Sequence, residues 1–576
     1  MRPGPATGGL PSPQTKISAS LRRRLPFAAF LLGFTLYCAY LQFQLYDALS
    51  RLFLVRIFFQ VALAALVIAT MRNVVGVRTL GMFAPAIIAL AFLATGLPLG
   101  LALLGLILAI VLLTRGAVLR ERIQESHRVA ILVTMVGITI SSIALIGLEF
   151  NLHELFFSVL FPVLITAWMG ERYVEQVTRV GWEGPTKTLV WTMTAIVISF
   201  LLITQDPLVD FVMLNPLLWP VLILLNWFLG THVRLRLSER FRFLGVRHYV
   251  LSSDPVRGDF SDDVLTMTVR NREFVAKYNP PDLMARLGKD EAKALLMPQG
   301  IPVARTYMII REKGDLAFLK AWFKDHYQFA LKPASGYGGE GILLVRGMKN
   351  GVYDTDTGLL EPATIEAHAA RIVDGEFNGG QPDAALVEEL LVQDEALRDL
   401  APIGLADIRV ICFRGYPVMA MVRIPTVASG GKANIHVGAV AAGISISTST
   451  IIHSVWRGVP QPYHPDTGQL LLGRKLPFWD EILEVAAEAQ RLTGLGFAGV
   501  DVALDARRGP VVMEVNRRPG LEIQNANGAG LLRRLKAIDA LQTAQLPAET
   551  RIKIVKQLDS EGWGLRTRRS TDSPAA

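Results

Sequence analysis

The stretch "KPASGYGGEGI", residues 332–342, places a lysine ahead of a loop in which four of seven residues, 336–342, are glycine. Such loops can bind phosphates, and they can also be ordinary flexible turns. A Walker loop carries its lysine after the glycines, whereas Lys332 comes before them. The flanking segments "QFALK" and "ILLVR" are typical of strands, so no helix follows as it would in a Rossmann loop. The loop alone leaves a phosphate lid and a structural hairpin turn open.

Two later segments supply the polar groups that a nucleotide site needs. "ALVEELLVQDEAL" (385–397) predicts a strand whose end can pass an adenine edge, with Glu395 in reach of ribose hydroxyls. "GFAGVDVALDARRGPVVMEVNRRPG" (496–520) predicts two strands around a turn, in which Glu514 and Asn516 share a face. Their oxygens and that of Asp501 suit Mg²⁺. Singly each acid is better explained as a solvated strand residue, but together and in this order they favour a nucleotide site.

The order of these pieces resembles an ATP-grasp domain over residues 271–540. The resemblance is carried by "RLGKDEAKALLMPQGIPVARTY", "ALKPASGYGGEGI", "ALVEELL", "ADIRVICFRGYPVMAMVRIPT…KANIHVGA" and "GVDVAL…MEVNRRPGLE". Within that superfamily the segment is most similar to the ribosomal-protein glutamate ligases and to a subgroup called α-L-glutamate-ligase-like. The resemblance implies a ligase that activates a carboxylate with ATP and Mg²⁺ as an acyl phosphate and joins it to an amine, releasing ADP.

The same resemblance assigns roles to individual residues. It implies ATP binding by Lys289, Lys332, Gly336, Gly338, Gly339, Gly341, Glu388, Glu389, Leu391 and Glu395, Mg²⁺ binding by Asp501, Glu514 and Asn516, and catalysis by Arg409, Arg423 and Asn434. His436 is interpreted as structural.

Two departures from the family pattern stand out. Lys289 is aligned with the phosphate lysine of the first helix, with Lys293 as a rival. Arg517 and Arg518 follow Asn516 where the ligases tend to have small residues, so the substrate preference does not carry over. The carboxylate and the amine remain unidentified.

The first ~230 residues have a different character, because they hold the long apolar runs that a bilayer requires. Hydrophobic residues make up 51% of the chain and charged residues 19%, and the mean hydropathy is +0.36. Eight apolar segments are predicted as spans: 26–46, 52–71, 80–95, 97–114, 129–148, 155–170, 188–204 and 213–230. The part 80–114 can be two spans or a re-entrant hairpin around Gly96–Pro98.

Loop charges predict the orientation of these spans, since cytosolic loops are rich in arginine and lysine. Alternate loops carry most of the positive charge, with only Arg51 against the pattern, so both termini are expected in the cytosol. The formal net charge of +9 is therefore explained by topology, and no nucleic-acid motif accompanies it. Arg56 lies about one turn inside the second span and is interpreted as snorkelling outward. The two cysteines, Cys38 and Cys412, do not predict a disulfide framework.

The region 50–245 is similar to a bacterial seven-helix membrane domain found joined to an inactive transglutaminase-like domain. The similarity rests on "GMFAPAIIAL" (81–90), "SVLFPVLITAWMGERY" (158–173) and "LRLSERFRF" (235–243). It implies the inner membrane of a bacterium, contact with the lipid bilayer, and a transglutaminase-like or other membrane partner. Span 26–46 is additional to the seven.

The expected fold class is thus an all-α polytopic membrane domain plus an α+β ATP-grasp domain. The expected plan is a basic tail (1–25), a transmembrane domain (26–243), a linker (244–270), the ATP-grasp domain (271–545) and a C-terminal tail with a disordered end (546–576). Besides a membrane-anchored ligase, two functions stay open: an ATP sensor or ATP-driven export component, and a phosphotransferase that acts on a hydroxyl.

Overall fold

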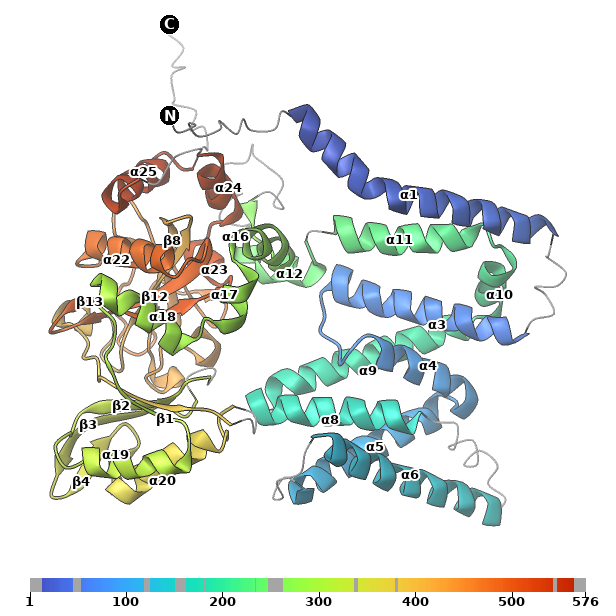
Figure 1. Ribbon diagram of the computed structural model, residues 1–576, viewed down its shortest axis with the longest axis horizontal. Helices are drawn as coiled ribbons and strands as arrows, with labels where there is room; N and C mark the ends of the chain where they lie inside the picture. The colour runs from blue at the N-terminus through green and yellow to red at the C-terminus, as the bar shows by residue number, and fades with distance from the viewer. Residues whose placement is uncertain are drawn as a thin grey trace, which may run out of the picture. The chain divides into compact units, whose positions relative to one another are not determined.

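The chain divides into two compact units, each of which is described by itself. The computed structural model describes residues 13–44, 53–118, 125–150, 162–180, 182–233, 235–246, 263–335, 340–378, 382–541 and 546–563. One unit comprises residues 1–177 and 181–233, and the other residues 178–180 and 234–576. Figure 1 shows that helices build the first unit, whereas the second combines sheets with covering helices. The predicted fold class, all-α plus α+β, is confirmed.

Helices of the first unit pack around a core of aliphatic side chains and Phe92. They are α1 (Pro13–Gln44), α3 (Phe53–Thr70), α4 (Phe83–Thr95), α5 (Leu97–Val118), α6 (Glu125–Glu149), α8 (Val163–Val180), α9 (Glu183–Ile203), α10 (Asp206–Leu214) and α11 (Leu218–His232). A π-helical turn, Met71–Val75, follows α3 and ends at Gly76, whose positive φ suits glycine. Packing of α4 and α3 against α9 closes the core.

Six helices in the described part of the chain are long and apolar enough to cross a membrane. The candidate spans are Pro26–Phe43, Val55–Val75, Leu97–Thr114, Ala130–Glu149, Gly184–Ile203 and Leu218–Arg242. Two of the eight expected spans account for the difference. Segment 80–95 forms α4, an apolar helix of only 13 residues. Residues 155–161 of the segment 155–170 lie outside the described ranges, and α8 begins at Val163, near its middle.

Arg56 does not snorkel alone, because it pairs with two carboxylates on α10. Its guanidinium contacts Asp206 and lies 3.6 Å from Asp210. One turn further along α3, Gln60 donates to the carbonyl oxygen of Ile203 at 3.2 Å. These contacts join the start of α3 to the connection between α9 and α10, so the charge of the intramembrane arginine is compensated within the unit.

Two antiparallel sheets form the framework of the second unit. The six-stranded sheet has the order β1-β6-β2-β3-β4-β5 and the seven-stranded sheet the order β11-β10-β9-β8-β7-β12-β13. The strands are β1 (Thr306–Ile310), β2 (Phe329–Pro333), β3 (Leu343–Lys349), β4 (Val352–Thr355), β5 (Gly358–Leu360), β6 (Ala385–Glu388), β7 (Asp407–Phe413), β8 (Tyr416–Ile424), β9 (Val440–Ile444), β10 (Ile451–Trp456), β11 (Val459–Pro460), β12 (Phe497–Asp505) and β13 (Gly509–Asn516).

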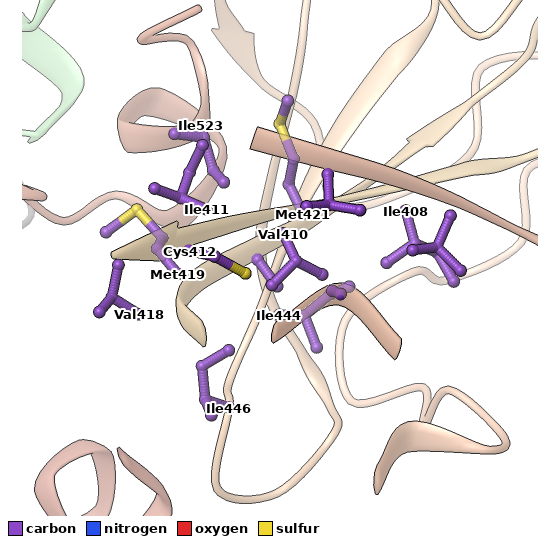
Figure 2. Close-up of a cluster of buried hydrophobic side chains, with 14 of the residues drawn as sticks. Ile408, Val410, Ile411, Cys412, Val418, Met419, Met421, Ile444, Ile446 and Ile523 are labelled. Atoms are coloured by element: carbon purple, nitrogen blue, oxygen red, sulfur yellow. The ribbon is translucent and has the colours of Figure 1, made fainter. Parts of the chain in front are cut away.

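Each sheet has its own core. Helices α19 (Leu316–Trp322) and α20 (Pro362–Val373) pack on the six-stranded sheet around Phe329 and Tyr353. The seven-stranded sheet is covered by α22 (Trp479–Leu492), α23 (Ile523–Asn527), α24 (Leu532–Ala540) and α25 (Ala548–Ser560). Figure 2 shows the aliphatic side chains of β7 and β8 that fill its centre, with Cys412 among them. These strands are buried on both faces, which explains their nearly continuous apolar sequence.

The packed unit extends beyond residues 271–545 on both sides. On the amino-terminal side, Val264 and Leu265 are fully buried in the core of the large sheet, although they lie in the expected linker. Residues 247–262 of that linker lie outside the described ranges. On the carboxyl-terminal side, α25 buries Ile552 and Val555. Apolar side chains three residues apart on one helix face make 548–560 part of the fold instead of a tail.

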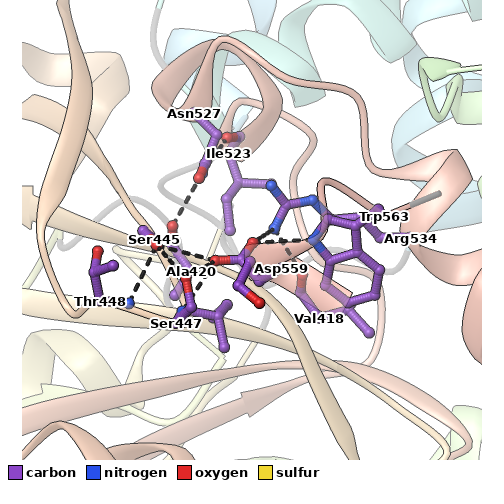
Figure 3. Close-up of polar contacts among 12 residues, drawn as sticks. Val418, Ala420, Ser445, Ser447, Thr448, Ile523, Asn527, Arg534, Asp559 and Trp563 are labelled. Atoms are coloured by element: carbon purple, nitrogen blue, oxygen red, sulfur yellow. Dashed lines mark hydrogen bonds and ion pairs between the residues drawn. The ribbon is translucent and has the colours of Figure 1, made fainter. Parts of the chain in front are cut away.

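A buried carboxylate fixes α25 to the sheet (Figure 3). Asp559 accepts hydrogen bonds from the Ser445 hydroxyl, from the backbone and hydroxyl of Ser447, and from the Trp563 indole, at 2.9 to 3.0 Å. The Arg534 guanidinium lies 3.3 Å away. Burial opposes ionisation of Asp559, but the charge of Arg534 and these donors outweigh it and hold the pKa below its usual range.

Candidate functional site

Neighbouring strands of the large sheet bring together most of the polar residues predicted between 407 and 516. In the antiparallel register Asp501 on β12 lies opposite Glu514 on β13 and opposite Arg409 on β7. Asp407 lies opposite Arg423 on β8. Directly opposed residues project on the same face of a sheet, so four neighbouring strands contribute to one polar cluster.

Two arginines hold the carboxylate of Asp501. Arg409 binds it in a bidentate manner, with Nε at 2.7 Å and Nη2 at 2.6 Å. Arg423 Nη2 lies 2.8 Å from Asp501 Oδ2 and also pairs with Asp407. Burial of Asp501 favours the neutral acid, but the two guanidinium groups outweigh it and lower the pKa to about 2. Asp501 therefore carries its charge throughout the physiological range.

The predicted metal residues form a compact donor set beside these arginines. Asn516 Nδ2 donates to Asp501 Oδ2 at 3.1 Å, and Glu514 lies two residues before Asn516 on the same strand face. The half-buried Glu514 carboxylate makes no hydrogen bond or ion pair with any described residue. No group of three His, Cys, Asp or Glu side chains gathers in the described ranges, so this set is two carboxylates and an amide. Oxygen donors of this kind fit Mg²⁺, and the metal role of these residues stays a prediction.

A second polar cluster lies on the small sheet and contains two lysines. Glu388, at the end of β6, accepts from Lys293 at 2.6 Å and from Lys332 of β2 at 2.5 Å. Burial opposes ionisation of Glu388, yet the two ammonium groups hold its pKa below the usual range. Lys293 comes from α18 (Lys289–Leu296). The structure thus brings Lys293 to Lys332, while the side chain of Lys289 lies outside the described part.

The predicted adenine hinge follows β6 and is held by backbone contacts. The Glu389 amide donates to the Arg305 carbonyl oxygen at 2.8 Å, and its carboxylate pairs with Arg508 at 2.8 Å. The carbonyl oxygen of Leu390 accepts from Arg507. Among the described residues no hydrogen bond engages the backbone of Leu391, so its N–H and C=O are available to a ligand.

Glu395, predicted near the ribose, is the most exposed member of the set. It begins α21 (Glu395–Arg398), its side chain is 89% exposed, and it lies 3.7 Å from Arg398. No described contact ties it to the two polar clusters. Apart from the pair with Arg398, no contact in the described part fixes the position of this side chain, so its role in binding ribose stays a prediction.

The glycine loop is described only at its two ends. Gly336, Gly338 and Gly339 lie outside the described ranges. Gly341 has a φ of +74°, and a Cβ built on it would lie 2.6 Å from the ring of Phe377. Its carbonyl oxygen lies 2.9 Å from His368 Nε2, and the amide of Ser335 donates to Asp383 at the other end. Both ends are fixed to the small sheet and its helix.

Asn434 and the two arginines that follow Asn516 lie outside the strands that carry the clusters. Asn434 precedes a short 3₁₀ turn, Ile435–Val437, in the connection that follows β8, and its side chain accepts from the amide of His436. The guanidinium of Arg517 donates to the carbonyl oxygen of Met284 at 2.6 Å, which gives this arginine a structural contact. Arg518 is exposed.

Sequence reasoning missed Asp407 as a member of the arginine cluster. It lies two residues before Arg409 in "ADIRV", so the alternation of a strand was a signal that both point to one face.

Two family models match the chain, each over a different part. Residues 269–540 match the family model described as sugar-transfer associated ATP-grasp. Residues 36–247 match the model described as seven transmembrane helices usually fused to an inactive transglutaminase. The chain joins an ATP-grasp domain to a multi-pass membrane domain. No curated protein matches it. The description that matches the ATP-grasp domain does not name glutamate ligases, so that finer resemblance stays a prediction.

Solved structures similar to the chain include the ATP-grasp ligase PsnB, a D-cycloserine synthetase and a D-alanine-D-alanine ligase. The ligase PsnB complexed with its minimal precursor has 17% identity, 46% coverage of this chain, 62% coverage of that chain and a TM-score of 0.26. The D-cycloserine synthetase DcsG has 15% identity, 47% coverage of this chain, 73% coverage of that chain and a TM-score of 0.26. The D-alanine-D-alanine ligase of Coxiella burnetii has 14% identity, 48% coverage of this chain, 58% coverage of that chain and a TM-score of 0.24. The chain spans less than two thirds of the PsnB chain.

Proposed function

We propose that the protein is a membrane-anchored carboxylate–amine ligase that uses ATP and Mg²⁺ and releases ADP. The observation that carries the proposal is the cluster of Arg409, Arg423, Asp501, Glu514 and Asn516 on four adjacent strands of the ATP-grasp domain. Two arginines beside oxygen donors for a metal suit the charge of a phosphoryl group in transfer.

The reaction proceeds in two steps. A carboxylate oxygen of the first substrate attacks the γ-phosphorus of ATP, the bond to the β-phosphate oxygen breaks, and ADP leaves. The amine nitrogen then attacks the acyl carbon, phosphate departs with the electrons of the C–O bond, and the surplus proton of the amine passes to solvent. Catalysis of such a transfer consists mainly of positioning and charge neutralisation.

The proposed residue roles combine the resemblance with the contacts that support them. Lys332 and Lys293 supply positive charge for the nucleotide phosphates, and Leu391 offers backbone groups to adenine. Arg409 and Arg423 bind the transferred phosphoryl group, for which their planar forks are suited. Glu514, Asn516 and Asp501 would hold Mg²⁺, which neutralises phosphate charge when bound. Asn434 orients the acyl group from its loop, and the glycine loop covers the phosphates.

The membrane unit anchors this ligase, and we propose that it lies in the bacterial inner membrane with the ATP-grasp domain in the cytosol. ATP is supplied on that side, and the loop arginines independently favour it. A transglutaminase-like protein or another membrane protein is the expected partner.

An experiment on the purified full chain in detergent tests the chemistry. L-Glutamate and a panel of other amino acids and dicarboxylic acids are each added with Mg-ATP and hydroxylamine, and hydroxamate and nucleotide products are measured. We expect one class of acid to give a hydroxamate together with ADP. AMP and pyrophosphate would contradict the mechanism. Nucleotide binding without turnover on any acid would favour the alternative, an ATP sensor or export component.

A further inference from the structure

Glu388 lies where the chain brings two lysines from distant elements to one carboxylate. Lys293 comes from α18, Lys332 from β2, and Glu388 from the end of β6. Lys293 Nζ lies 2.6 Å from Oε1 and Lys332 Nζ 2.5 Å from Oε2, so each carboxylate oxygen holds one ammonium group. The Thr306 hydroxyl adds a weaker contact of 3.4 Å to Oε1.

Burial makes this arrangement energetically important. Glu388 is 2% exposed and Lys293 5% exposed. Two ammonium groups this close to each other repel, and a buried ion that loses its partner is strongly destabilised. Glu388 neutralises one of the two positive charges and leaves a surplus of one. The site is therefore held together without nucleotide and still attracts a further anion.

The same contacts direct both oxygens of the Glu388 carboxylate to lysine ammonium groups. Both carboxylate oxygens are engaged, whereas the backbone of Leu391, three residues on, has free groups among the described residues. An ammonium group has three N–H donors. Lys332 makes its contact with Glu388 and no other in the described part, so donors remain for phosphate oxygens.

We propose that Glu388 is a positioning residue that holds Lys293 and Lys332 in place for the nucleotide phosphates and does not read adenine. The inference rests on the proposed function only in requiring that the domain binds adenine nucleotides. It replaces the expected role of Glu388 as part of the adenine hinge with a role on the phosphate side of the site.

Comparison of two ligands tests this proposal, because adenosine has the base and ribose of ADP without its phosphates. Titrations of ADP with Mg²⁺ and of adenosine are made with the full chain and with Glu388→Gln, which keeps the shape and removes the charge. We expect the affinity for ADP to fall by about tenfold or more, since charged hydrogen bonds are lost, and that for adenosine to stay unchanged. Glu484→Gln, on the exposed face of α22 and outside the site, is the matched control and should leave both affinities unchanged.

A second variant guards against loss of the fold. Glu388→Asp keeps the negative charge but is one methylene shorter, and it should recover part of the ADP affinity. Equal losses for ADP and adenosine would overturn the proposal in favour of adenine recognition, and unchanged or higher ADP affinity in Glu388→Gln would overturn it as well. If the wild-type chain binds neither ligand, the proposed function itself fails along with it.

Discussion

At the scale of single residues, Glu514 differs from Asp501, the other carboxylate among the metal candidates, because it is not engaged by an arginine. Its carboxylate has no described partner, whereas Asp501 is held by Arg409 and Arg423. We expect Glu514→Gln to fold normally and to lose ATP turnover by roughly a hundredfold or more, because phosphate charge is then poorly neutralised. Lys332→Ala should instead mainly weaken nucleotide binding. ADP release measures turnover, ADP titration measures binding, and circular dichroism checks that both variants are folded.

A surface carboxylate serves as the control for that prediction. Glu484 is exposed on α22. Glu484→Gln removes the same charge from the same domain and should leave turnover unchanged. Normal turnover in Glu514→Gln would show that the metal assignment is wrong even where the ligase activity exists.

Gly341 tests how the glycine loop is anchored. Its φ of +74° and the approach of the Phe377 ring both exclude a side chain. We expect Gly341→Ala to lower the unfolding free energy by about 1–2 kcal/mol and to weaken ADP binding, because the backbone must shift. Gly347→Ala on β3 is the control, since a Cβ there meets nothing within 4 Å. Thermal unfolding and ADP titration are the measurements, and equal behaviour of the two variants would contradict the argument.

Contacts between site residues could be predicted only for residues that lie close together in the sequence. Glu514 and Asn516 share a strand, so the period of two placed them on one face. Lys293 and Glu388 are 95 residues apart, and their contact depends on how α18 docks beside β13, for which no local pattern exists. The resemblance aligned Lys289 and kept Lys293 as a rival; Lys293 shares the Glu388 carboxylate with Lys332, and the alignment of Lys289 stays a prediction.

At the scale of elements, the sequence predicted the strands well because β-branched runs and turn residues agree. The β7–β8 hairpin turns at Arg414 and Gly415, both with positive φ, as a tight two-residue turn requires. The limits of the domain were less visible, since polar residues dominate 548–560 and few apolar side chains, chiefly Ile552 and Val555, mark its buried face. Long-range contacts of Asp559, absent from any local pattern, decide that α25 belongs to the fold.

The Asp559 contacts predict how that element responds to pH. Asp559 has a lowered pKa when folded, so its contribution to stability is present above the unfolded pKa of about 3.9 and is lost as pH falls through the folded value. We expect Asp559→Asn to cost about 1–3 kcal/mol at pH 7, with the difference from wild type shrinking below about pH 4. Urea unfolding of the full chain at several pH values measures this.

Another acid that contacts α25 provides the comparison. Asp480 pairs with Lys556 at the surface and is largely exposed. Asp480→Asn should therefore cost less than about 1 kcal/mol at pH 7. If the two variants were equally stable at neutral pH, Asp559 would not be what holds α25 to the sheet.

At the scale of the whole molecule, membrane topology links the two units functionally. A ligase that uses ATP must face the cytosol, and the loop arginines predict the same side for both termini. An alkaline phosphatase fused after Ala576 should be inactive and a fluorescent protein there should be bright. Phosphatase inserted at 149–154 should be active. Activity of a phosphatase at the carboxyl terminus would contradict both the orientation and the proposed enzyme.

The rate at which the Cys412 thiol is alkylated can report how often the large sheet opens. This thiol is fully buried at the centre of the large sheet (Figure 2), and burial raises its pKa, so the reactive thiolate is scarce while the sheet is intact. In a Cys38→Ser background it is the single thiol of the chain. Its alkylation must wait for the sheet to open, so the labelling half-life reports how often the domain unfolds in its native membrane. A ligand that binds only the folded domain would lengthen that half-life, which allows candidate nucleotides and substrates to be ranked without any assay of the reaction.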